Sequence, residues 1–91
     1  MKNSKQLERH LKGVANHRRI DILFLISENH GIALDEIAKN LDCNLKTISG
    51  HTLKLVQAGL IEKKYNDRAV LHSLSPYGKI FVKFIGNFQK L

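Results

Sequence analysis

The fold of this protein is indicated most clearly by residues 34–60, LDEIAKNLDCNLKTISGHTLKLVQAGL. Its first part carries apolar side chains at helical spacing and predicts a helix over 36–41 with Asp35 as its cap. A three-residue turn, DCN, follows. Asn44 then caps a second helix, predicted over 45–58, and the glycine after it is well placed to end that helix. Two helices joined by so short a turn indicate a helix-turn-helix.

The sequence on either side of this pair predicts the remaining elements. An asparagine and an aspartate between two β-prone segments suit a hairpin turn. Ser75 followed by Pro76 is typical of a helix start. The elements expected are helices over about 5–13, 17–29 and 76–89, a short strand at 32–34, and a hairpin with strands 60–65 and 69–74. The fold class is therefore mainly α with a small β-hairpin: one domain over 1–91, a winged helix-turn-helix with five helices and a two-stranded wing over 61–74.

The charge of the chain is positive and uneven. The 91 residues carry a formal net charge of +7. Residues 1–42 hold seven Lys or Arg against six Asp or Glu, whereas residues 43–91 hold eight against two. A basic half on a small domain suggests a polyanionic partner, either nucleic acid or an acidic membrane surface. A charge that serves only solubility is the alternative reading.

The sequence points away from several classes of protein. A single cysteine, Cys43, forms no internal disulfide, which fits a reducing cytoplasm. The longest apolar run, Ile22 to Ile26, is far short of a membrane span, so no membrane partner is expected. No glycine-rich phosphate loop, nucleophile elbow or paired-carboxylate motif is present. The expectation is a cytoplasmic protein that is not an enzyme and needs no cofactor.

The five histidines and Cys43 raise the question of a metal site. None of them forms a close pair such as HxH or CxxC, so their spacing gives no support for metal binding. No metal is expected.

Four segments, in this order, resemble the winged-helix transcription regulators of the arsenical-resistance-regulator (ArsR) type. NHRRIDIL (16–23) resembles the family's NPxRxxIL, LDEIAKNL (34–41) resembles xxELAxxL, KTISGHTLKLVQAGLI (46–61) resembles STVSxHLKxLxxAGLV, and KKYNDRAVLHSLSPYGK (63–79) resembles the family's wing and last-helix start. The resemblance covers about residues 14–78. Metal-sensing members carry cysteine pairs in the third helix or Asp, His and Glu sets in the last helix, and this chain has neither, so the resemblance implies no metal site.

Both the helix-turn-helix pattern and the resemblance place the second helix of the pair in a DNA major groove, with the hairpin along the backbone. Lysines on the outer face of that helix reach phosphates, and its polar side chains hydrogen-bond to phosphates or base edges. A cation at the hairpin tip is placed to enter a minor groove or to pair with a phosphate. The predicted DNA-binding residues are Asn44, Lys46, Thr47, Ser49, Gly50, His51, Lys54, Lys63, Lys64 and Arg68.

Gly50 is the unusual residue of this recognition helix, because glycine inside a helix costs about 1 kcal/mol relative to alanine. ArsR-type members usually have a long polar residue there, and often a basic residue where this chain has Leu53. One reading is that the missing side chain lets the helix backbone approach the duplex closely. The other is a weakened exposed position that reads DNA with less specificity.

Aromatic residues in the last helix are spaced four, three and four residues apart, as in a coiled-coil seam. Together with two leucines of the first helix they offer more apolar surface than a small domain can cover. We therefore predict a two-fold homodimer with recognition helices about 34 Å apart, matching half-sites one helical turn apart. The predicted interface consists of Leu7, Leu11, Tyr77, Phe81, Phe84 and Phe88.

The function predicted from the sequence is a dimeric transcription regulator that binds double-stranded DNA and represses by occupying a promoter. Two alternatives remain open. One is a winged helix used for protein–protein contact, whose basic face would meet an acidic protein. The other is an effector-responsive sensor with a ligand site at the dimer interface.

Overall fold

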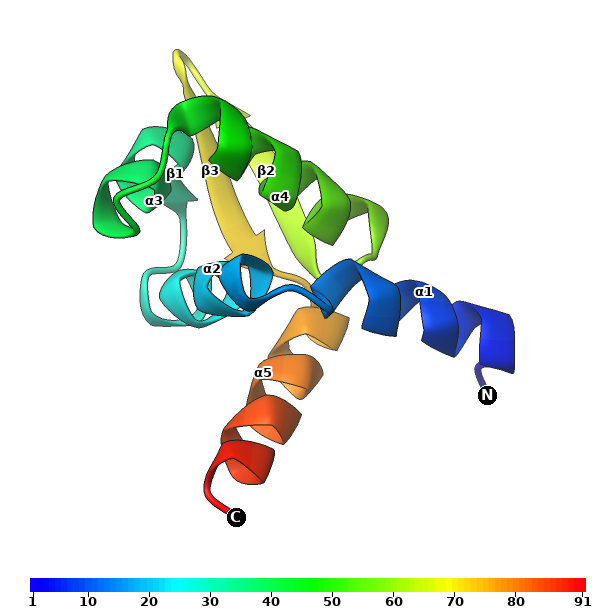
Figure 1. The fold of residues 1–91 in the computed structure, drawn as a ribbon. Coiled ribbons are helices and arrows are strands. Elements are labelled where there is room, and N and C mark those ends of the chain that lie inside the picture. Colours follow the sequence, from blue (N-terminus) through cyan, green and yellow to red (C-terminus); the bar gives the residue numbers. More distant parts are fainter.

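The computed structural model describes residues 1–91 and shows five helices around a small antiparallel sheet (Figure 1). In chain order the elements are α1 (Ser4–Val14), α2 (His17–Glu28), β1 (Ile32–Ala33), α3 (Leu34–Asn40), α4 (Leu45–Gln57), β2 (Ile61–Asn66), β3 (Ala69–Leu74) and α5 (Pro76–Gln89). The turn of the β2–β3 hairpin stands beside α3 and α4, and α5 ends at the opposite side of the domain (Figure 1). The predicted winged helix-turn-helix is confirmed.

Side-chain caps start four of the helices, and two of them, Asn44 and Ser75, lie at positions that the sequence predicted. Asn3 and Gln6 form a capping box at α1, and Asn16 accepts from the first backbone N–H groups of α2. The Asn44 side chain accepts from the Thr47 N–H at 2.9 Å and so starts α4. These bonds satisfy N–H groups that have no partner inside the helix.

The predicted cap of α3 is wrong. The helix begins at Leu34, and the N-cap residue is Ala33, whose N–H donates to the Glu36 side chain at 3.4 Å. Ala33 is paired with Leu71 in the sheet, so the chain passes directly from strand to helix. Leu34 packs against the core, which draws the first turn of α3 to an earlier position than the local pattern suggests.

The sheet has three strands rather than the two of the predicted wing. β1 pairs with β3 through Ile32 opposite His72, and the strand order is β1-β3-β2. The hairpin between β2 and β3 is confirmed, with Asn66 opposite Ala69 at its last pair. Its turn has two residues, and the first, Asp67, has a φ of +53°, a conformation that aspartate tolerates.

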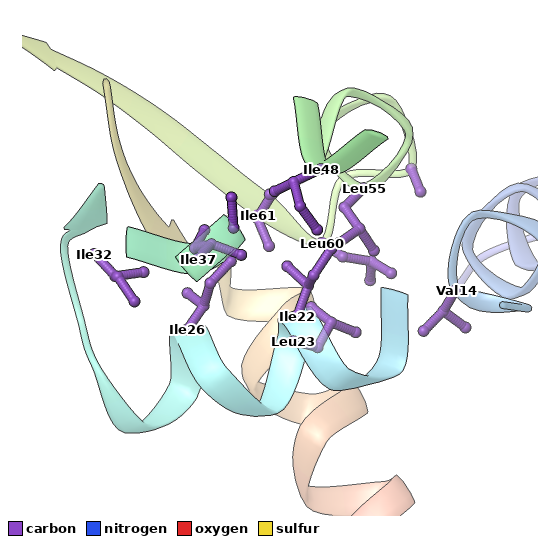
Figure 2. Close-up of a cluster of buried hydrophobic side chains, with 12 residues drawn as sticks. Val14, Ile22, Leu23, Ile26, Ile32, Ile37, Ile48, Leu55, Leu60 and Ile61 are labelled. Atoms are coloured by element: carbon purple, nitrogen blue, oxygen red, sulfur yellow. The ribbon is translucent and has the colours of Figure 1, made fainter. Parts of the chain in front are cut away.

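The hydrophobic core lies between α2, α4 and the sheet (Figure 2). Ile22, Leu23 and Ile26 of α2 are buried in this cluster together with Ile48 and Leu55 of α4 (Figure 2). Thr52, also buried, lies between them in sequence, and its hydroxyl donates to the Ser49 carbonyl at 3.0 Å. These three buried residues form one stripe along α4, which fixes which face of this helix turns outward.

The end of α4 is joined to the start of α5. Gly59 follows α4 with a φ of +76°, which only glycine adopts without strain. The Ser75 hydroxyl donates to the Gly59 carbonyl at 2.6 Å and accepts from the Gly78 N–H at 3.0 Å. One side chain therefore links the residue that follows α4 to the first turn of α5.

Two of the five histidines are buried structural residues. His72 lies opposite Ile32 in the sheet, and its Nδ1 is 3.2 Å from the Ile32 carbonyl oxygen. Because a carbonyl only accepts, the proton sits on Nδ1. Burial lowers the pKa of His72, against the hydrogen bond to Ile32, which raises it. His10 is likewise buried, with Nδ1 on the Ala58 carbonyl, and holds α1 against the end of α4.

Candidate nucleic-acid interface

The outer face of α4 carries the predicted recognition residues on the surface. Lys46, Thr47, Ser49 and Lys54 are all exposed. Asn44 is exposed as well, but its side-chain oxygen is already engaged in capping α4, so only its amide NH₂ is free to contact DNA. Together these side chains offer hydroxyl, amide and ammonium groups along one ridge, which suits contact with base edges and phosphates.

Leu53 is exposed, with 46% of its surface accessible, and is not drawn into the core. The recognition face therefore contains one apolar side chain among polar ones. An apolar group on such a face can contact the methyl group of thymine.

Gly50 is also exposed, and a Cβ added there would meet no atom within 4 Å. The fold itself therefore does not require glycine at this position. The absent side chain leaves helix backbone open on the side that faces away from the core.

Gly50→Ala should raise the free energy of unfolding by about 0.5–1 kcal/mol, because alanine is the better helix former and its methyl group meets open space. Urea denaturation at one protein concentration measures the gain. Gly86→Ala is a matched control, since a Cβ at that helical position of α5 also meets nothing within 4 Å. DNA titrations of Gly50→Ala then separate the two readings of this residue: weaker binding supports close approach, and unchanged or tighter binding supports a merely weakened position.

His51 differs from its neighbours because a second helix holds it. It is half-buried, and Arg19 of α2 donates from Nε to His51 Nδ1 at 3.2 Å. Burial first, and then the charges of Arg19, His17 and Arg18, lower the pKa of His51. The ring is therefore neutral at pH 7, accepts at Nδ1 and carries its proton on Nε2. His51 is thus fixed as a hydrogen-bond donor at Nε2.

Arg19 is a residue of this site that the predicted set missed. Besides His51, it donates from Nη1 to the Gly13 carbonyl at 3.3 Å, whereas its neighbour Arg18 pairs with Asp21 at 3.9 Å. No pattern within the recognition helix identifies it, because it comes from α2. The signal in the sequence is a basic residue in the first turn of a helix, where it opposes the helix dipole and is expected to have a partner outside the helix.

The wing carries its cations on different faces. Lys63 is half-buried and lies opposite the buried His72 in the sheet. Lys64 follows it in β2, so its side chain points to the other face. Lys64 and Arg68 are exposed, and Arg68 lies in the turn. Lys64 and Arg68 are therefore more accessible to a DNA backbone than Lys63 is.

An extended apolar surface lies on α1 and α5, away from the recognition helix. We call it the apolar face and define it by its exposed side chains: Leu7, Leu11, Tyr77, Ile80, Phe84 and Phe88. The rings of Phe84 and Phe88 lie next to each other, with centroids 6.1 Å apart. Five of the six residues of the predicted dimer interface belong to it.

Phe81, the sixth predicted interface residue, is placed differently. It is half-buried and packs against the core, with its ring centroid 6.2 Å from that of His10. Tyr77 contacts the same histidine at 5.2 Å. Phe81 therefore belongs mainly to the packing of α5 onto its own domain, because the helix must bury part of its stripe there.

The side chains that commonly bind metals are scattered over the domain. No group of three or more His, Cys, Asp or Glu side chains lies close enough to hold a metal ion. No helix combines the length and the apolar character needed to cross a bilayer.

A protein-family model described as HVO_A0114 matches residues 14–82. The chain belongs to the HVO_A0114 family. The HVO_A0114 match includes every predicted DNA-binding residue and excludes the outer parts of the apolar face: Leu7, Leu11, Phe84 and Phe88. No curated protein matches the chain in sequence.

Solved structures similar to this HVO_A0114 member include transcriptional regulators and a winged helix-turn-helix domain. HlyU from Vibrio cholerae N16961 has a TM-score of 0.87 at 25% identity, over 99% of this chain and 98% of that chain. A transcriptional regulator, HlyU from Vibrio vulnificus CMCP6, has a TM-score of 0.78 at 26% identity, over 94% and 90%.

A third similar structure is described as the homodimeric winged helix-turn-helix DNA-binding domain of Mb0332 from Mycobacterium bovis, a possible ArsR-family transcriptional regulator. Its TM-score is 0.87 at 24% identity, over 94% of this chain and 80% of that chain. The predicted fold and the predicted resemblance to ArsR-type regulators are confirmed by these similarities.

Proposed function

We propose that this protein is a homodimeric transcription regulator that binds double-stranded DNA, with α4 in the major groove and the wing on the backbone. The observation that carries the proposal is the outer face of α4. It is a polar and basic ridge on a helix whose inner face is fixed by Ile48, Thr52 and Leu55 in the core. A helix held in this way presents its outer side chains in one defined register. The regulators among the similar structures support the same function.

The dimer is supported by the apolar face. Phe84 and Phe88 keep 58% and 66% of their surface accessible, and Leu7 and Leu11 keep 48% and 54%. So many large apolar side chains exposed on two helices are unfavourable in water and are usually covered by a partner. In a dimer with a two-fold axis, the apolar face of each copy covers the apolar face of the other. We propose that the dimer places two α4 helices on successive turns of the duplex and represses by occupying a promoter in the cytoplasm.

Fluorescence-anisotropy titration of the purified protein with random-sequence duplex DNA tests the proposal. We expect a stoichiometry of two chains per site and an affinity that falls steeply with salt, because lysine and arginine contacts release counterions from the phosphates. If the protein does not bind duplex DNA even at low salt, the proposed function is wrong. The basic surface would then belong to an acidic protein partner.

Lys64→Ala should weaken binding to all duplex sequences about equally. It should also reduce the salt slope, which is the steepness with which the logarithm of the binding constant falls with the logarithm of the salt concentration, by about 1 for each phosphate that the side chain neutralises. We expect Lys63→Ala to act in the same direction but less, because this side chain is half-buried beside His72. Lys90→Ala removes the same charge at the far end of α5 and is the control. Titrations of each variant at several salt concentrations measure both effects.

Changes on α4 should instead alter which sequences are preferred. Thr47→Ala is the cleaner variant because its side chain is exposed, whereas His51→Ala also leaves Arg19 without a partner. Selection of bound sequences from a random duplex library gives the preference. Unaltered preference in both variants would remove the assignment of α4 as the recognition helix.

A further inference from the structure

A second basic surface lies beside the recognition face and shares Lys54 and Arg19 with it. It is a shallow hollow between α1 and the second half of α4, and we call it the basic hollow. Four cations from three helices line it: Arg9 and Lys12 of α1, Arg19 of α2 and Lys54 of α4. Gln57 is its other polar side chain, and no carboxylate lines it.

The two helices on either side of the basic hollow are held close together. A Cβ added to Gly13 of α1 would lie 2.1 Å from the Ala58 Cβ at the end of α4, so glycine permits an approach that no other residue allows. The buried ring of His10 adds a hydrogen bond to the Ala58 carbonyl. These contacts fix Arg9 and Lys12 opposite Lys54 without any bound partner.

The positive charges of the hollow are poorly neutralised within the protein. Arg19 is bound only to uncharged acceptors, the Gly13 carbonyl and His51. Lys12 pairs with Glu8 at 3.6 Å, but both side chains are more than half exposed, at 77% and 61%, and such pairs contribute little. Arg9 and Lys54 have no carboxylate within ion-pair distance. Four like charges around one hollow repel one another unless an anion lies between them.

We propose that the basic hollow binds a phosphate of the DNA backbone beside the groove that α4 enters, which makes α1 a third DNA-contacting element. The hollow is continuous with the recognition helix, because Lys54 belongs to α4 and Arg19 contacts His51. Its shallow, open form suits a phosphate on a long strand, and Arg is well suited to bidentate phosphate contact. This inference rests on the proposed DNA-binding function.

The proposed dimer leaves the hollow accessible. At 3.6 residues per turn, the midpoint of Arg9 and Lys12 lies about 150° around α1 from the midpoint of Leu7 and Leu11. One side of α1 therefore carries the apolar residues for the partner copy, and the other carries the cations. A helix that joins the two copies and also contacts the backbone links dimerisation to DNA binding.

The test compares two double variants of the full chain. Arg9→Gln with Lys12→Gln removes two charges from the hollow, and Lys83→Gln with Lys90→Gln removes two exposed charges from α5. Each is titrated with random-sequence duplex DNA at several salt concentrations, after circular dichroism and sedimentation confirm the fold and the oligomeric state. The dimer has two hollows, so we expect the hollow variant to lower the salt slope by about 1.8 more than the control, at about 0.9 per phosphate contact.

If the two double variants show the same salt slope and the same DNA affinity, and the wild type binds DNA normally, the proposed phosphate contact of the basic hollow is wrong. The proposed DNA-binding function would still stand. Failure of the wild type to bind DNA would overturn the proposed function and this inference together. Inorganic phosphate, added at constant ionic strength, distinguishes a free anion from the backbone. The inference is wrong if phosphate raises the Tm of the wild type but not of the hollow variant, while the salt slopes of their DNA binding agree. The hollow would then be a site for a free anion.

Discussion

Gly78→Ala should destabilise the domain by about 3 kcal/mol or more, because overpacking against rigid neighbours leaves few ways to relax. A Cβ at this buried position of α5 would lie 1.9 Å from the Leu60 carbonyl oxygen and 3.4 Å from the Leu74 Cβ. The first of these is backbone, so it cannot rotate away as a side chain can. The Gly78 N–H also donates to Ser75, and any shift of α5 would strain that cap.

Urea denaturation followed by circular dichroism measures this decrease in stability. A domain of this size has a total stability of about 5–14 kcal/mol, so the variant should lose a large part of it and unfold at much lower urea. Gly86→Ala lies in the same helix with open space around its new methyl group and should change stability in the opposite direction. All proteins are compared at one concentration, because dimerisation contributes to apparent stability. A Gly78→Ala protein as stable as the wild type would show that α5 does not pack on Leu60 as described.

Phe84→Glu combined with Phe88→Glu should separate the dimer into monomers. The two rings form the outer part of the apolar face, and neither is needed to fill the core of its own domain. Glutamates from the two copies would meet at the two-fold axis, where like charges repel as they lose water. Glutamate is also a good helix former, so α5 itself should persist.

DNA affinity should fall together with dimerisation, by about 10²–10⁴-fold, because two linked recognition helices bind as one unit and two separate ones do not. Analytical ultracentrifugation gives the oligomeric state, and anisotropy gives the affinity. Lys83→Gln with Lys90→Gln changes the charge of α5 by the same amount away from the aromatic pair, and it should remain a dimer. A dimer that survives both phenylalanine changes would place the interface elsewhere.

The local elements of this protein could be predicted from its sequence. Asn44 and Ser75 cap helices where the sequence places them, because capping depends on residues within three positions of each other. The hairpin forms around Asp67 for the same reason, since a turn is decided by the few residues in it. The outer face of α4 followed from the inner one, because helical periodicity fixes both.

Contacts between distant segments could not be predicted in this way. β1 joins the sheet through β3, forty residues away, and the pairing of Ala33 moves the start of α3 away from the predicted cap at Asp35. Phe81 turns inward, although its spacing matches that of the exposed aromatics, because His10 of another helix packs against it. Local propensity is a weak constraint where tertiary packing opposes it.

The helix-turn-helix, the wing and the polar face of α4 follow from local sequence, since each is encoded by residues that are near neighbours in the chain. The docking of α1 on α4, and the side chains that meet there, depend on the packing of the whole domain. Gly13 against Ala58, and Arg19 against His51, join segments 45 and 32 positions apart in the sequence. Such pairs leave no periodic pattern, because they depend on where whole helices come to rest when the core is packed.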